Sequence, residues 1–344
     1  MSMKQSKAAL FGFALAASSM VAGPAFGQSV EDFYRDKTLT LIVSADAGTV
    51  TDTIARQFAR FFVKYIPGEP QPVVQNIVGA GGMVAAASLQ TKLSNDGTVI
   101  GLLQRNNLYT PLLDPTQTNF DPREVEWLGS LDKVHYSLVA MSRSGVGSVE
   151  GLFENDLIIG ATGFSNENRI LPAMLNEYIG TKMNIVPGYT GRSEVYLAME
   201  RGEVDGWAST TAGLHVGEPA RMLDDGSLKV LLQMAWESHP DFPDAPNLSD
   251  YVTDPEVRAL FGFFLSPLEA GRPIAVSNDV PQERLDALND AFMKTIEDPE
   301  FIEVMKDSGF PIDAIDGDAV EKIISKLYST PDTVIEEALR LRNL

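Results

Sequence analysis

Hydrophobic residues follow two alternating patterns along the first half of the chain. Apolar runs that suit strands occupy 38–45 (TLTLIVSA), 71–78 (QPVVQNIV) and 97–104 (GTVIGLLQ). Between the first two runs, apolar residues recur at helical spacing until Pro67, and this helix has an apolar face made of Ile54, Phe58, Phe61, Phe62 and Tyr65. A second, alanine-rich helix is expected after Gly82. The alternation predicts a parallel sheet covered by helices.

A second series of strands and helices begins near residue 136. Its expected strands are 136–142, 156–163, 183–191, 204–210 and 228–235. Its expected helices are 167–180 and 193–202. The last part of the chain is helical instead, since the segments 280–298, 298–309 and 330–344 each begin with proline in the first turn. The whole pattern predicts an α/β protein with mostly parallel sheets.

The first 27 residues have the pattern of a secretory signal peptide. Lys4 and Lys7 precede an uncharged apolar run from Ala8 to Val21, and small residues stand at Ala25 and Gly27. The apolar run is too short for a spanning helix. We therefore expect cleavage after Gly27 and export of the mature protein to a bacterial periplasm.

Composition limits the class of partner. The 344 residues are 44% hydrophobic and include no cysteine, so the stability of two ordinary domains has to come from packing without disulfides. The net charge is −20, and loss of Lys4 and Lys7 with the signal peptide makes it −22. Such acidity argues against nucleic acid as a partner.

Signatures of catalysis and of metal binding are missing from the sequence. His135, His215 and His239 stand alone, without the spacing of a metal site. The sequence contains no nucleophile elbow, no phosphate-binding loop of the Walker type and no thiol. We expect no cofactor and no metal, while an exported α/β enzyme that acts on a small carboxylate stays open as an alternative.

The stretch NIVGAGGMVAAA (76–87) resembles the glycine turn of dinucleotide-binding proteins. Gly79, Gly81 and Gly82 are present, but Val84 stands where that fingerprint needs its third glycine. Asp96 is the acidic residue nearest the expected ribose-binding position, and it lies in a turn. The stretch therefore predicts only a tight turn that opens a helix with free N–H groups.

Small polar residues recur where a strand gives way to a helix. Five such turns are 44–56, 76–82, 102–109, 160–168 and 186–194. In an open α/β sheet these turns gather at the carboxyl edge of the strands, where ligands bind. Helix N-termini there offer unpaired N–H groups and partial positive charge, which suits a carboxylate. Together the five turns predict a ligand cleft.

Four long segments resemble one family of transport proteins. They are FYRDKTLTLIVSADAGTVTDTIAR, VVQNIVGAGGMVAAASLQTKLSNDGTVIGLL, VPGYTGRSEVYLAMERGEVDG and GRPIAVSNDVPQERLDALNDAF. They are similar to the Bug or TctC family, the extracytoplasmic solute-binding proteins of tripartite tricarboxylate transporters. The resemblance implies a type II periplasmic binding protein fold, with lobe 1 at 28–137 and 265–344 and lobe 2 at 138–264. It also implies capture of a small carboxylate (a di- or tricarboxylate, an aromatic or an amino-acid carboxylate) and its delivery to membrane transporter subunits.

The same resemblance implies a set of ligand contacts. They are Ala47, Gly48, Thr49, Thr51, Asp52, Gly79, Ala80, Gln104, Asn106, Thr162, Gly163, Ser165, Asn166, Tyr189, Thr190 and Gly191. Thr49 replaces the second glycine of the family's first loop, which adds a hydroxyl there. Thr51 either caps the following helix or turns toward the ligand. Asp52 is expected to hold the loop, because like charges at contact would repel a carboxylate.

Other charged residues leave alternatives open. Arg169 and Arg192 could clamp a carboxylate, although arginine in the first turn of a helix is more often solvated. Asp205 is expected to be a structural turn residue. The acidity and Thr49 also leave room for a neutral or cationic solute. The protein is expected to be a monomer.

Overall fold

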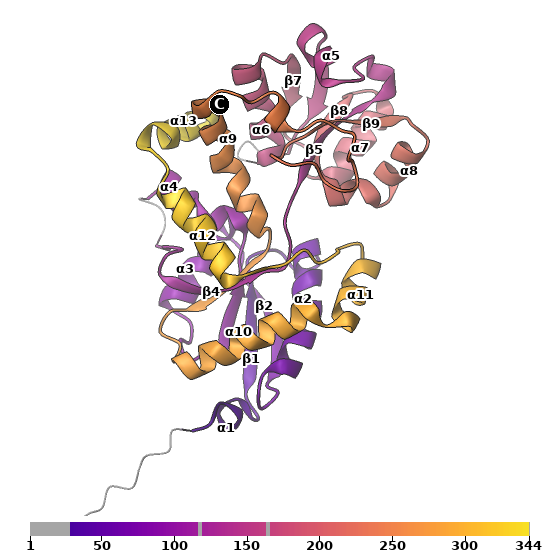
Figure 1. Ribbon diagram of the computed structural model, residues 1–344. Helices are drawn as coiled ribbons and strands as arrows, with labels where there is room; N and C mark the ends of the chain where they lie inside the picture. The colour runs from indigo at the N-terminus through magenta and orange to yellow at the C-terminus, as the bar shows by residue number, and fades with distance from the viewer. Residues whose placement is uncertain (1–27, 116–118, 163–165, 344) are drawn as a thin grey trace, which may run out of the picture.

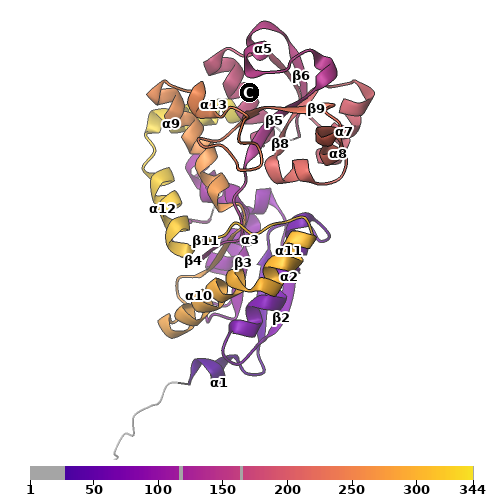
Figure 2. The same cartoon turned by 45° about the vertical axis from the view of Figure 1, so that its right-hand side comes forward.

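Two sheets form the framework of the protein in the computed structural model, which describes residues 28–115, 119–162 and 166–343. Figure 1 shows the sheets in two bodies, one above the other, and Figure 2 shows the same arrangement after a 45° turn. The predicted signal peptide lies outside the described residues.

The lower body holds the first sheet, whose strand order is β11-β4-β10-β3-β1-β2. Its strands are β1 (Thr38–Val43), β2 (Gln71–Asn76), β3 (Val99–Leu102), β4 (Val125–Ser130), β10 (Pro273–Ser277) and β11 (Ile315–Asp316). Its helices are α1 (Val30–Tyr34), α2 (Val50–Phe62), α3 (Met83–Thr91), α10 (Gln282–Glu297) and α11 (Pro299–Asp307). Ile54, Phe58, Phe61 and Phe62 of the face expected for α2 are buried, whereas Tyr65 is half-buried in the 3-10 turn that follows the helix. The Phe58 ring centroid lies 4.9 Å from that of Phe62 and 6.1 Å from that of Phe292 of α10.

The upper body holds the second sheet, whose strand order is β7-β6-β8-β5-β9. Its strands are β5 (Tyr136–Met141), β6 (Leu157–Gly160), β7 (Met183–Val186), β8 (Gly206–Thr210) and β9 (Leu228–Gln233). Its helices are α5 (Val149–Glu154), α6 (Glu167–Met174), α7 (Arg192–Arg201) and α8 (Glu218–Asp224). The five strands expected from the sequence between 136 and 235 are thus all confirmed.

One central strand of each sheet runs against its neighbours. β10 is antiparallel to both β3 and β4, and β5 is antiparallel to both β8 and β9, so β4 keeps the direction of β3 and β9 that of β8. β5 and β10 are the strands that follow the two passages of the chain between the sheets. Each enters its sheet from the side where the parallel strands end. β11 is also antiparallel to β4, so both sheets are mixed. The predicted α/β class is confirmed, whereas periodicity could not supply the direction of these antiparallel strands.

Four helices lie between or across the two bodies: α4 (Thr110–Leu113), α9 (Pro255–Leu265), α12 (Gly317–Tyr328) and α13 (Asp332–Asn343). α9 and α12 run along one side of the molecule, and the C-terminus lies beside the upper body (Figure 1). α13 contacts α4, α6 and α9, and one buried apolar cluster includes Trp127 of β4, Leu138 of β5 and Phe264 of α9. Since these helices pack against both bodies, the lobe boundaries at 137/138 and 264/265 stay a prediction.

Candidate ligand-binding cleft

A cleft of about 560 Å³ lies where the turns of the first sheet face the start of α6. Its lining residues are Ala45, Asp46, Thr49, Thr51, Ala80, Gly81, Leu103, Gln104, Arg105, Asn106, Tyr109, Thr110, Leu113, Asn166, Glu167, Ile170, Phe264, Gly271 and Arg272. Six of the predicted contacts are in this set: Thr49, Thr51, Ala80, Gln104, Asn106 and Asn166. The other predicted contacts within the described residues, Ala47, Gly48, Asp52, Gly79, Thr162, Tyr189, Thr190 and Gly191, are not.

The first loop is closed by Asp52. Its Oδ2 accepts the Gly48 N–H at 2.9 Å, and its Oδ1 accepts Asn76 Nδ2 at 3.0 Å. The Arg56 guanidinium donates to the same carboxylate at 3.0 Å. The hydrogen bond from Arg56 is the largest of the effects that lower the pKa of Asp52 to about 2. Asp52 therefore holds the loop as an anion, in the role that the sequence indicated.

The cap of α2 is Thr49, not Thr51. Thr49 Oγ1 accepts the Asp52 N–H at 3.4 Å and donates to the Asp46 carbonyl at 2.7 Å. Thr51 is the second residue of the helix and lines the cleft. The capping alternative for Thr51 was wrong because the helix begins two residues earlier than the apolar periodicity indicated. The extra hydroxyl of Thr49 is used within the loop.

The glycine turn is built from four consecutive residues with positive φ, namely Gly79, Ala80, Gly81 and Gly82. Such angles are strained for a residue with a Cβ. Asn106 and Asn107 donate from Nδ2 to the Gly81 carbonyl at 3.0 and 3.2 Å, which fixes the turn against the end of β3. α3 begins at Met83 directly after it. The turn therefore forms a wall of the cleft and starts a helix, as the sequence indicated.

Gln104 ties the third turn to the first. Its Nε2 donates to the Ser44 carbonyl at 2.6 Å, and its backbone N–H donates to Asn107 Oδ1 at 3.2 Å. The side-chain amide of Gln104, which was expected to contact the ligand, therefore also positions the loops.

The second body contributes less to the cleft than expected. The Thr162 hydroxyl is engaged by Asn166 Nδ2 at 2.6 Å and by Asn168 Nδ2 at 2.9 Å, while Gly163 and Ser165 lie outside the described residues. Thr190 donates from its N–H and its hydroxyl to Glu194. Tyr189, Thr190 and Gly191 follow β7, an edge strand of the second sheet, and do not line the cleft. Their contact with a ligand stays a prediction.

The four charged residues of the cleft lining, Asp46, Arg105, Glu167 and Arg272, were not among the predicted contacts. Arg105 follows β3, and its Nη2 donates to Glu167 Oε2 of α6 at 3.2 Å and to the Tyr136 hydroxyl at 3.3 Å. Glu167 and Tyr136 are almost fully buried. Burial is the largest single effect and would lower the pKa of Arg105, but the combined contributions of Glu167, Tyr136 and Tyr109 outweigh it and the pKa is raised. Arg105 stands between Gln104 and Asn106, so the strand-end position was the available signal.

A second ion pair lies where the chain passes between the two bodies. Arg272, on the return passage, pairs with Asp132 on the outward one. The Gly271 N–H donates to the Asp132 carbonyl at 2.8 Å, and the Arg272 N–H donates to Ser130 Oγ at 3.1 Å. The two passages are therefore tied together at the back of the cleft.

The arginines considered as clamps lie elsewhere. Arg169 is only 8% exposed, so the expectation of a solvated side chain was wrong for it. It is buried because α6 is enclosed on nearly all sides, with seven of its eight residues buried, and burial lowers the pKa of Arg169. Arg192 is exposed and donates to the Gly213 carbonyl at 3.4 Å. Neither lines the cleft. Asp205 lies before β8 and pairs with Arg143 at 3.3 Å, which fits the structural role.

The three histidines do not stand alone in space. The rings of His135 and His239 lie 5.1 Å apart, and Asp241 Oδ2 lies 2.9 Å from His215 Nε2 and 3.4 Å from His239 Nδ1. Folding brings together residues that are distant in sequence. Among the described residues, no group of three or more His, Asp or Glu side chains has the geometry to hold a metal ion.

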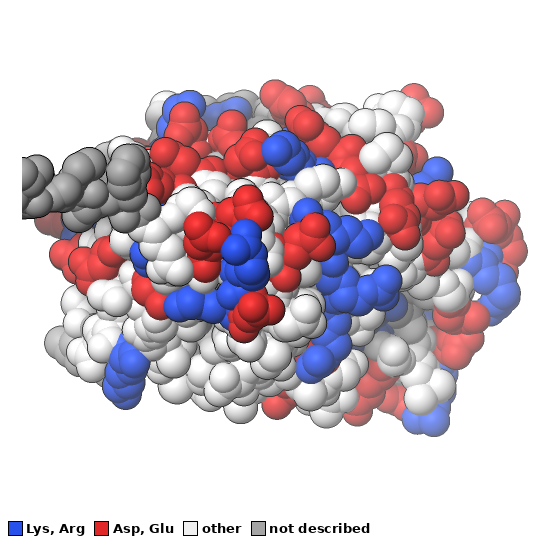
Figure 3. Space-filling model, turned by 90° about the horizontal axis from the view of Figure 1, so that it is seen from below, with Lys and Arg blue, Asp and Glu red and all other residues white. Residues whose placement is uncertain are grey.

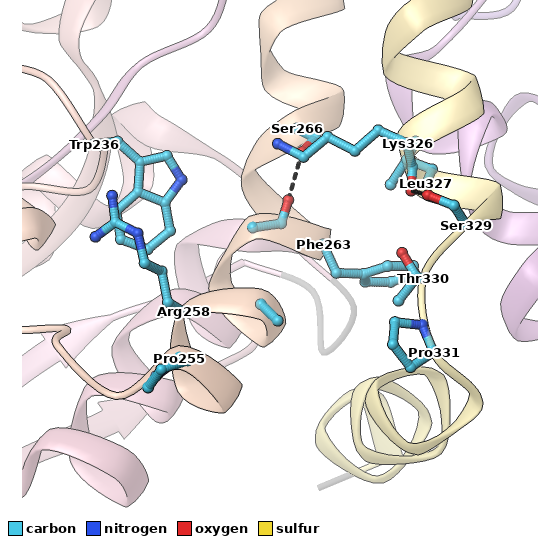
Figure 4. A pocket seen from close by; sticks show the side chains of 12 residues that line it. Trp236, Pro255, Arg258, Phe263, Ser266, Lys326, Leu327, Ser329, Thr330 and Pro331 are labelled. Carbon is cyan, nitrogen blue, oxygen red and sulfur yellow. Dashed lines mark hydrogen bonds between the residues drawn. The ribbon is translucent and has the colours of Figure 1, made fainter.

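A separate hollow of about 430 Å³ lies between α9 and the α12–α13 connection. Figure 4 shows Arg258 over the Trp236 ring on one side and Lys326 reaching in from the other. It contains none of the strand-end turns and stands apart from the cleft.

On the face seen in Figure 3, Lys and Arg side chains lie among Asp and Glu side chains. Within the described part of the chain, no helix is long and apolar enough to cross a membrane.

Two α/β bodies joined by paired passages, with one cleft lined by strand-end turns, define the architecture of a two-lobed solute-binding protein. Residues 54–339 match the model of the tripartite tricarboxylate transporter family receptor. The chain belongs to this family.

Individual relatives agree with this assignment. The chain is 24% identical, over 79% of its length and 75% of the other protein, to the UPF0065 protein in the TAR-I ttuE-ttuC' intergenic region of Agrobacterium vitis. A TctC solute-binding protein from Polaromonas has a similar structure, with a TM-score of 0.70, 20% identity and coverage of 90% of this chain and 99% of that one. MatC from Rhodopseudomonas palustris with bound malate gives a TM-score of 0.58, 18% identity and coverage of 89% and 99%. These similarities show the two-lobed fold.

Proposed function

We propose that the protein captures a small carboxylate in the cleft and delivers it to the membrane subunits of a tripartite tricarboxylate-type transporter. Family membership supports the receptor role, and MatC, with its bound malate, supports the ligand class. The mature chain, beginning at Gln28, works in the periplasm as a monomer, since residues of one chain line both sides of the cleft. It binds its ligand without turnover and without a metal.

The start of α2 is the observation that carries the ligand class. Thr51 lines the cleft, and the N–H groups of Val50 and Thr51 donate to none of the described residues. They are the first two amides of a 13-residue helix, whose dipole places partial positive charge there. Asp52 keeps its own charge inside the loop, bonded to Gly48, Asn76 and Arg56. A ligand carboxylate at the start of α2 can therefore accept hydrogen bonds from the N–H groups of Val50 and Thr51.

Calorimetric titration of the mature protein with malate, adipate, citrate, benzoate and glutamate tests the proposal. The corresponding neutral amides and a diamine serve as controls. We expect at least one carboxylate to bind, with the same affinity in a strong chelator and with the ligand recovered unchanged by NMR. Binding of the diamine or of the amides alone would overturn the ligand class, and conversion of the ligand would favour the enzyme alternative.

Two further measurements address processing and assembly. Mass spectrometry of the periplasmic fraction is expected to show a chain that starts at Gln28, and an intact N-terminus there would contradict the cleavage site. Light scattering is expected to give the mass of one chain.

A further inference from the structure

The Arg105–Glu167 ion pair joins the two walls of the cleft. Arg105 belongs to the turn after β3, in the first sheet, and Glu167 is the first residue of α6, beside the second sheet. Both side chains line the cleft, and their contact is 3.2 Å between Nη2 and Oε2. A ligand that fills the cleft therefore meets this pair directly.

The pair uses only part of the guanidinium. The hydrogen bonds of Arg105 to Glu167 and to the Tyr136 hydroxyl are both made by Nη2. Nε is buried without a partner, and Nη1 donates to no residue of the described chain. Arginine and a carboxylate pair most strongly through two parallel N–H···O bonds, which this contact does not form. The guanidinium keeps capacity for a second carboxylate.

The other charges around the cleft pair beside it or have the wrong sign. Arg272 pairs with Asp132 at the passages between the bodies, although its Nε, like that of Arg105, is buried without a partner. Asp46 and Glu167 are the acidic residues of the lining. Arg105 is thus the basic lining residue that faces across the cleft instead of pairing beside it. The side chain is 26% exposed and that of Glu167 is 9% exposed, so solvent screens their charges weakly.

We propose that Arg105 is a specificity-determining residue that binds an anionic group of the ligand, and that Glu167 is its internal competitor, which occupies the guanidinium until the ligand displaces it. This inference rests on the proposed function and adds a second anchor to the helix start at Thr51. The ligand carboxylate and the Glu167 carboxylate then compete for the Arg105 guanidinium. The affinity gained at Arg105 is the difference between the binding free energies of these two carboxylates. Ligands with a single anionic group gain little from Arg105, because one carboxylate cannot occupy both anchors.

Titration of malate and adipate, with the monocarboxylates butyrate and hexanoate, tests this inference in two single variants, their double variant and a control variant. Glu167→Gln removes the competitor, and we expect it to tighten dicarboxylate binding. Arg105→Gln is expected to weaken it about tenfold or more, since a hydrogen bond to a charged group contributes about 1.5–3 kcal/mol and about 1.4 kcal/mol is tenfold. Monocarboxylate binding should change less. In Arg105→Gln/Glu167→Gln, the gain from Glu167→Gln should disappear.

Arg258→Gln is the matched control, since it removes an arginine from the separate hollow of Figure 4. Thermal melts check folding, and Arg105→Lys and Glu167→Asp replace any variant that fails to fold; Lys should bind dicarboxylate better than Gln. Weaker dicarboxylate binding in Glu167→Gln would overturn the inference in favour of a latch between the walls. Unchanged binding in Arg105→Gln would overturn it while the proposed function stands. Failure of the wild type to bind any carboxylate would overturn both.

Discussion

The carboxylate of Asp52 accepts the backbone N–H of Gly48 at 2.9 Å, and this contact folds the first loop back onto the helix that follows it. Asp52 also receives bonds from Asn76 and Arg56, although its side chain is only 5% exposed. A single buried anion thus joins the loop after β1, the end of β2 and the start of α2. The shape of this cleft wall depends on the ionisation of one residue.

We expect Asp52→Asn to lower the free energy of unfolding at pH 7 by about 2 kcal/mol, from a pKa shift worth about 1.4 kcal/mol per unit. The pKa in the fold is about 2 against an ordinary 3.8, so the stabilisation is present above 3.8 and is lost as the pH falls toward 2. Urea unfolding at pH 7 and pH 2.5 measures the effect. Asp307→Asn, an exposed position in α11, is the control. An equal difference from the wild type at both pH values would contradict the prediction.

Thr49 and Thr51 are expected to separate stability from binding. Thr49→Ala removes the α2 cap and should cost about 1 kcal/mol of stability. Thr51→Ala leaves the cap intact and should weaken carboxylate binding by about 1 kcal/mol with little change in melting temperature. Calorimetric titration and thermal melts of the two variants make the comparison. If Thr51→Ala melts lower but binds normally, the placement of the carboxylate at this helix start is wrong.

Gly271→Ala should destabilise the passages between the bodies. A Cβ at this position would lie 2.7 Å from Val134 Cγ2 and 2.8 Å from Asp132 Oδ1, too close for either to remain in place. We expect a loss of about 1–3 kcal/mol, as for overpacking of a well-packed site. Gly262→Ala is the control of opposite sign, because no atom lies within 4 Å of that Cβ and alanine favours helix α9 by up to about 1 kcal/mol. Chemical denaturation compares both, and equal effects would contradict the steric argument.

The contact between His135 and His239 predicts a loss of stability in weak acid. Burial lowers the pKa of His135, and the neighbouring His239 lowers it further. A base whose pKa is lower in the fold binds protons more readily when unfolded, so stability is lost as the pH falls through the ordinary value of 6.5. The groups that face His135 are His239, Lys133 and Asp313. His135→Gln should reduce the change in denaturation midpoint between pH 7.5 and pH 5.0, whereas His215→Gln, which does not pack on His135, should not. If the denaturation midpoint of His135→Gln changed between pH 7.5 and pH 5.0 as much as that of the wild type, this assignment would be contradicted.

Local sequence patterns were enough to predict much of the secondary structure and the presence of a cleft. The spacing of Ile54, Phe58 and Phe61 fixed the buried face of α2, because helical periodicity needs only neighbouring residues. Resemblance over long segments gave the family and the two-lobed fold, and the strand-end turns indicated a cleft. Thr49, Thr51 and Asp52 were placed at the start of α2, but of the two roles left open for Thr51 the capping role belongs to Thr49, because the onset of a helix is weakly marked in sequence.

Tertiary structure decided the contacts between distant segments. Arg105 and Glu167 are 62 positions apart, and each alone resembles an ordinary charged residue at a helix start. The direction of β5 and β10 depends on where the chain passes between the sheets, which no local period records. Composition and periodicity therefore determined which segments become strands and helices, while chain topology alone decided which charged side chains meet across the cleft.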